Sequence, residues 1–183
     1  MPTFVALLRG INVGKAKRIP MAELRDLLGG LGYTSVATLL NSGNARFRAS
    51  KGTSAKHASE ISAAIATSFQ FDVPVIVKSA KELAAIATEN PFAKKAADHS
   101  RLLIAFVQDA KSLTGLKPLQ TLAVPPEEFV VGKNAAYLHC VSGILESKVG
   151  KALLGKEGKA TTTRNWATVL KLLTLAGVSA PEV

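Results

Sequence analysis

The chain has 183 residues, of which 48% are apolar, so it is long enough to bury a core without disulfides or metal ions. Its 23 basic and 13 acidic side chains give a formal charge of +10, which favours attraction to polyanions. The single cysteine, Cys140, excludes an intramolecular disulfide. No apolar run approaches the roughly 20 residues of a membrane-spanning helix, so we expect a cytoplasmic protein without a membrane segment.

The first half of the chain shows alternating strand and helix patterns. Strands are expected where short apolar runs end in turn residues, and helices where apolar residues recur every three or four positions. In chain order, the expected elements are a strand at 3–9, a helix at 21–32, strands at 35–40 and 45–50, a helix at 54–69, a strand at 73–79 and a helix at 79–90. We expect Ser54 or Ser59 to cap the helix over 54–69.

The second half repeats this order with different residues. Its expected elements are a strand at 101–109, a weaker helix at 111–122 that contains Pro118, a hairpin at 127–140 turning at 132–134, a helix at 145–155, a strand at 159–164 and a helix at 165–177. The repeat predicts an α+β protein of two tandem ferredoxin-like (βαββαβ) subdomains, each followed by a helix. Their predicted bounds are 1–90 and 91–183, joined near residues 90–98.

The stretch from Arg9 to Lys15 combines glycines with basic and amide side chains. Phosphate-binding P-loops and dinucleotide-binding motifs need other glycine spacings, so both are excluded. Backbone N–H groups of a glycine turn, with Arg9, Asn12 and Lys15 as donors, could still hold an anion. The alternative is a loop that uses glycine for backbone freedom and exposes its basic residues to water.

A second polar turn, Asn41-Ser42-Gly43-Asn44, separates the two central strands of the first half. Asn41, Ser42 and Asn44 are candidate ligand-binding residues, and a hairpin turn without function is the alternative. The sequence lacks a nucleophile-elbow pattern around Ser42, so it makes no case for a hydrolase.

Near the C-terminus, Lys148, Arg164 and Asn165 complete the candidate anion-binding set. Asn165 is a plausible N-cap for the last helix, and Arg164 stands beside the N–H groups of that helix start. Trp166 is expected in the core.

No metal site or cofactor is expected from the sequence. The adjacent pair His139-Cys140 would point to opposite faces of a strand, which favours a core cysteine and a surface histidine over a shared metal ion. Acidic residues are sparse and form no close pair suited to general acid and base catalysis.

Several motifs resemble the bacterial family catalogued as domain of unknown function 1697. They are "FVALLRGINVGKAKRIPMAELRDLLGGLGY", "LNSGNARF", "FDVPVIVKS", "NPF", "ESK" and "TTTRNWATVLKLL". The resemblance runs from about Phe4 to about Leu173 and implies two ferredoxin-like subdomains but no reaction. Its characteristic positions here are Arg9, Gly10, Asn12, Val13, Gly14, Pro20, Met21, Ser42, Gly43, Asn44, Ser147, Lys148, Arg164, Asn165 and Trp166. Related sequences often carry a further glycine where this chain has Lys15-Ala16.

Three functional readings follow. The leading one is weak, nonspecific binding of an anionic ligand, either nucleic acid or a phosphorylated compound, through basic loops rich in glycine and asparagine. The second is an enzyme acting on a small anionic metabolite held by Arg9, Lys148 and Arg164. The third is a structural or partner-binding protein with no small ligand. The strands lack interleaved aromatic residues, which argues against sequence-specific RNA recognition by a sheet face.

Overall fold

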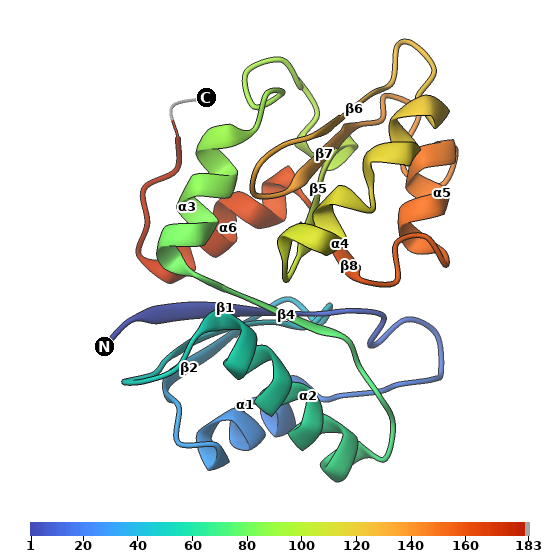
Figure 1. Cartoon of the computed structure of the whole chain (residues 1–183). Helices are drawn as coiled ribbons and strands as arrows, with labels where there is room; N and C mark the ends of the chain where they lie inside the picture. Colours follow the sequence, from blue (N-terminus) through green and yellow to red (C-terminus); the bar gives the residue numbers. More distant parts are fainter. Residues whose placement is uncertain (182–183) are drawn as a thin grey trace. The chain divides into compact units, whose positions relative to one another are not determined.

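The computed structural model describes residues 1–181. It shows a mixed α/β protein with two four-stranded antiparallel sheets and, within those residues, six α-helices (Figure 1). The chain divides into two compact units: Met1–Lys81 with Leu175–Val178, and Glu82–Thr174 with residues 179–181. Of the helices in residues 1–181, none is long and apolar enough to cross a membrane.

The first unit is a sheet with two helices packed on one face. Its elements are β1 (Thr3–Leu8), α1 (Met21–Gly30), β2 (Thr34–Leu39), β3 (Asn44–Arg48), α2 (Ser54–Phe69) and β4 (Val75–Ser79). The strand order is β2-β3-β1-β4, and each neighbouring pair is antiparallel. Figure 1 shows α1 and α2 on the same side of this sheet.

Strand and helix periodicity together build the first core. Alternate residues of β1, Phe4 and Leu8 among them, face the same buried cluster as Leu24 of α1 and Ile61 of α2. Full burial of one such side chain contributes about 1.5–3 kcal/mol. The apolar stripes therefore fix which face of each helix meets the sheet.

The second unit has the same succession of strands, with additional short helices. Its elements are α3 (Ala80–Glu89), which starts in the first unit, the 3-10 helix η1 (His99–Arg101), β5 (Leu102–Val107), α4 (Ala110–Thr114), the 3-10 helix η2 (Lys117–Leu122), β6 (Glu128–Val131), β7 (Ala136–His139), α5 (Lys148–Leu154), β8 (Thr161–Asn165) and α6 (Trp166–Ala176). Its antiparallel strand order is β6-β7-β5-β8.

The expected hairpin at 132–134 joins β6 and β7, which pair from Glu128 with His139 to Val131 with Ala136. Trp166 is fully buried, as expected. The hydroxyl of Tyr137 in β7 lies 2.7 Å from the carbonyl of Ile86 and 2.8 Å from the Glu89 carboxylate, both in α3, which share its one hydrogen in a bifurcated hydrogen bond. This bond connects α3 to the centre of the second sheet.

The weaker helix expected at 111–122 is instead two short helices, α4 and η2. Gly115 follows α4 directly, and Pro118 stands in the first turn of η2, where its missing N–H costs no hydrogen bond. A continuous α-helix through Pro118 would have lost one bond and clashed with the preceding turn.

Two smaller expectations were wrong. Thr53, not Ser54 or Ser59, caps α2, because its hydroxyl accepts a hydrogen bond from the Lys56 N–H at 3.2 Å. His139 is half-buried instead of lying on the surface, whereas Cys140 is buried as expected.

Candidate functional site

The connection from β1 to α1 is held firmly where it leaves the sheet. The backbone N–H of Leu8 donates to the carbonyl of Gly43 at 2.8 Å, and the N–H of Arg9 donates to the carbonyl of Pro74 at 3.0 Å. Ile11 and Ile19 are both buried, one near each end of the connection. The intervening residues therefore form a loop with two fixed ends.

Asn12 joins the two ends of this loop to each other and to a neighbouring turn. Its side-chain amide donates to the carbonyls of Ile19 at 2.9 Å and Asn41 at 2.7 Å, and its Oδ1 accepts from the Ile19 N–H at 2.9 Å. Both amide hydrogens are thus used within the protein. Its φ of 56° lies in the left-handed region, which asparagine tolerates better than most residues. Asn12 therefore positions the loop.

Residues 13–18 form the exposed tip of the loop. The N–H of Asn12 closes its base by donating to the carbonyl of Lys17 at 3.1 Å. The Lys17 ammonium donates to the Asp72 carbonyl at 2.8 Å, so this lysine also braces the tip. Lys15 and Arg18 are exposed, and residues 1–20 contain no acidic side chain. The tip therefore carries a concentrated positive charge.

A hollow of about 340 Å³ lies at the base of the loop. Its lining residues are Asn12, Arg18, Ile19, Pro20, Met21 and Asn41. Arg18 is the one charged residue among them. The hollow adjoins the start of α1, where Pro20 occupies the N-cap position and supplies no side-chain hydrogen bond. The first N–H groups of a helix lack intrahelical partners and carry partial positive charge.

The second predicted turn is organised mainly to close the β2–β3 hairpin. The buried Asn44 donates from its amide to the carbonyl of Leu39 at 2.9 Å and to the hydroxyl of Ser42 at 3.0 Å. Gly43 has a φ of +82°, and a Cβ there would lie 2.6 Å from the Cβ of Leu8, so no other residue fits. Of this turn, Asn41 reaches the hollow.

The structure therefore brings Asn12 and Asn41 together, while Arg9 and Lys15 lie on the same loop. Arg9 is half-buried, and burial lowers the pKa of its guanidinium. Sequence reasoning left Arg18 out of the candidate set. The position of Arg18 in the same basic stretch as Arg9 and Lys15 could have indicated it as a candidate.

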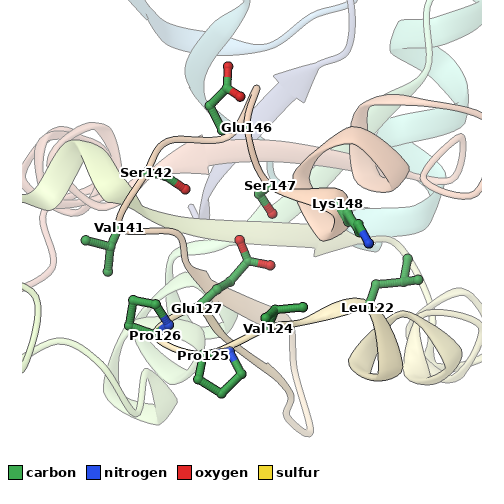
Figure 2. Close-up of a pocket in the computed structure, with 10 residues that line it drawn as sticks. All are labelled: Leu122, Val124, Pro125, Pro126, Glu127, Val141, Ser142, Glu146, Ser147 and Lys148. Atoms are coloured by element: carbon green, nitrogen blue, oxygen red, sulfur yellow. The ribbon is translucent and has the colours of Figure 1, made fainter.

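The C-terminal candidates all belong to the second unit. Lys148 is exposed and lines a different hollow, whose lining residues include neither Arg164 nor Asn165 (Figure 2). Arg164 is buried and donates from Nη1 to the Thr162 hydroxyl and the Thr163 carbonyl, both at 2.8 Å, and burial lowers its pKa to about 10. The Asn165 side chain accepts from the Thr168 N–H at 2.9 Å, which confirms it as a helix cap.

A buried polar cluster in the first unit belongs to the core. The Tyr33 hydroxyl donates to the Glu60 carboxylate at 2.9 Å and lies 2.9 Å from Nδ1 of the buried His57. The bond from Tyr33 lowers the pKa of Glu60. Rings of Phe4 and Phe47 pack against His57, with centroids 4.7 and 5.5 Å away. Within residues 1–181, no group of three histidine, cysteine or acidic side chains is placed to hold a metal ion.

Comparison with known proteins identifies a family and a similar fold, and the descriptions of both name no activity. A family model described as "Protein of unknown function (DUF1697)" matches residues 1–137, which include the whole loop but not Lys148, Arg164 or Asn165. A solved structure described as conserved bacterial protein SP0830 from Streptococcus pneumoniae is similar with a TM-score of 0.81 and 24% identity, covering 96% of this chain and 98% of that chain. This likeness supports the fold alone. A search of curated proteins found no match.

Proposed function

The chain belongs to the DUF1697 family of proteins of unknown function, and we propose that it binds an anionic ligand at the loop of its first unit. The observation that carries the proposal is the hollow between Arg18 and Asn41, which adjoins the uncapped start of α1. The ligand is a nucleic acid or a phosphorylated compound, bound weakly and without reading bases.

Charge and geometry both support this assignment. Lys15 and Arg18 provide cations on a tip whose ends are fixed, so less conformational entropy is lost on binding than for a free loop. The helix start adds N–H groups with partial positive charge, a common environment for phosphate. Residues 1–20 contain no acidic side chain, and Glu23 is the acidic residue in the first turn of α1.

We also propose that each half of the chain, with the bounds 1–90 and 91–183 expected from the sequence, is a ferredoxin-like βαββαβ subdomain. The same strand order in both sheets supports this topology. For the proposed anion site, the loop is shaped by five residues of the first unit: Arg9, Asn12, Asn41, Ser42 and Asn44.

The test is a titration of isotope-labelled protein, followed by amide NMR spectra, with inorganic pyrophosphate and with a short single-stranded oligonucleotide at low salt. We expect shifts concentrated in residues 9–21 and at Asn41. For the oligonucleotide, a K15Q/R18Q variant should lower the slope of log affinity against log salt by about two, one for each lost phosphate contact.

Lys51→Gln provides the matched control. Lys51 is an exposed cation of the same unit that follows β3, whose far end pairs with Thr3, so it lies at the other end of the sheet from the loop. The control should bind like the native protein. Equal weakening by K51Q would show a diffuse charge effect and overturn the site, as would shifts that avoid the loop.

A further inference from the structure

The second unit contains a hollow of about 370 Å³ that the loop site does not explain. Figure 2 shows side chains from two segments around it, residues 122–127 from the end of η2 to β6 and residues 141–148 from the end of β7 to the first residue of α5. Leu122, Val124, Pro125 and Val141 provide apolar walls. Val124 and Val141 are 61% and 51% exposed, so part of the apolar wall is open to solvent.

Glu127 supplies a carboxylate to this apolar setting. It is half-buried, and within residues 1–181 its side chain has no ion-pair partner. Figure 2 shows the carboxylate turned into the hollow, toward the hydroxyl of Ser147. Burial, and after it the negative charge of Glu127, raises the pKa of the buried Cys140 thiol. A partly desolvated carboxylate gains stability from a cationic partner.

Lys148 supplies the opposite charge on another side of the same hollow. It is the first residue of α5, whose N-cap Ser147 accepts a hydrogen bond from the Gly150 N–H at 2.8 Å, so the backbone that carries Lys148 is fixed. The ammonium is exposed and lies beside Leu122 in Figure 2. Glu146, the other acidic lining residue, turns its carboxylate away from this group (Figure 2).

We propose that this hollow binds a small zwitterion with an apolar carbon chain, about the size of leucine. Its ammonium would pair with Glu127, its carboxylate with Lys148, and its chain would pack against Val124, Pro125 and Val141. The volume falls in the range of small-molecule sites, which combine apolar walls with a few charged groups that fix orientation. A purely anionic or purely cationic ligand would leave one of the two charges unpaired.

The test is calorimetry and amide NMR on the full chain with leucine and its linear isomer 6-aminohexanoate. The two compounds share one composition and differ in the separation of their charges. At least one should bind, with shifts at residues 122–127 and 141–148. Hexylamine and hexanoate, which each keep one charge, should bind about tenfold more weakly than the better isomer, as expected for losing one charge-assisted contact.

Two variants separate the charges. E127Q should weaken the zwitterion and hexylamine about tenfold and leave hexanoate unchanged, whereas K148Q should weaken the zwitterion and hexanoate and leave hexylamine unchanged. E157Q, at an exposed residue outside the hollow, should change nothing. Native amide spectra of the variants would confirm folding. Failure of both isomers to bind, or equal binding of the singly charged analogues, would overturn the proposal without touching the loop site.

Discussion

The two units share a strand order but differ in how the first strand meets the first helix. In the first unit, residues 9–20 leave the sheet in a basic loop. In the second, only Gln108 and Asp109 separate β5 from α4, and the Asp109 carboxylate accepts a hydrogen bond from the Ser112 N–H at 2.7 Å.

The two hairpins also differ in whether a carboxylate of the protein binds their backbone N–H groups. Asn44 closes the first hairpin through neutral hydrogen bonds. In the second, the Glu89 carboxylate accepts from the N–H groups of Lys133 at 2.6 Å and Asn134 at 3.0 Å. The protein's own carboxylates thus occupy N–H groups in the second unit, whereas the start of α1 has no side-chain cap. Under the proposed function, the first unit would bind an external anion where the second unit uses its own carboxylates.

The largest effect is expected at the first hairpin. Gly43→Ala should destabilise the protein by about 3 kcal/mol, because its Cβ would overlap Leu8 and its φ of +82° disfavours a side chain. Gly14→Ala, at a φ of +66° with open space around it, should cost only about 1–2 kcal/mol. Urea denaturation measures both, and equal losses would show that backbone conformation alone matters.

Next in size is the carboxylate that closes the second hairpin. Glu89→Gln should cost about 2 kcal/mol by weakening charge-assisted bonds to two backbone N–H groups and the Tyr137 hydroxyl. Glu157→Gln, an exposed acidic residue, is the matched control. An equal loss of stability in the Glu157→Gln control would show that the hydrogen bonds of Glu89 do not cause the effect.

The same variant should change the pH dependence of stability. Burial acts to raise the pKa of Glu89, but the hydrogen bonds from Lys133, Asn134 and Tyr137 outweigh it and hold the pKa below its ordinary value. The carboxylate therefore stabilises the fold above its unfolded pKa, and this stability is lost as pH falls through the folded pKa. The free energies of unfolding of the native and E89Q proteins should therefore converge as the pH falls below about 4.5, the ordinary pKa of a glutamate.

A smaller effect is expected at the short connection of the second unit. Asp109→Ala should cost about 1 kcal/mol by removing the cap of α4. Thr53→Ala removes the cap of α2 in the first unit and should cost a similar amount. Thermal denaturation of the two variants measures both losses of stability. A much larger loss for Asp109→Ala than for Thr53→Ala would indicate that Asp109 has a role besides capping.

The smallest effect is expected at the loop tip. Lys15→Gln and Arg18→Gln should each change stability by no more than about 0.5 kcal/mol, because both side chains are exposed. Chemical denaturation checks this. A loss above about 2 kcal/mol would mark these cations as structural and remove the contrast with the second unit.

Local patterns predicted most of the elements because their causes are local. The apolar run of β5, the spacing of Ile61 and Ile65 in α2 and the cap Asn165 each depend on residues close in sequence. Thr53 was missed as a cap because it stands next to Ser54, and either hydroxyl suits the position chemically. The break between α4 and η2 was missed because the apolar pattern continues through Gly115 and Pro118. Predicting it would have required giving these two helix-breaking residues more weight than the pattern.

The candidate site was only partly predictable because it depends on pairing across the sheet. The bond from Asn12 to the carbonyl of Asn41 requires the register in which Leu7 faces Asn44, and composition does not give that register. The hollow around Glu127 is assembled from valines, prolines and a single acid, residue types that carry no local signal of a site.

The hydrogen bonds of Asn12 close the loop at its base, independently of the side chains exposed at its tip. Since Asn12 ties Ile19 and Asn41 together, the chain is already closed at the base of the loop, and residues 13–16 bear no share of that closure. Loop-closure entropy rises only slowly with added length. The exposed side chains of this segment can therefore be changed at little cost to the closure of the loop, apart from Gly14, whose φ of +66° disfavours a side chain.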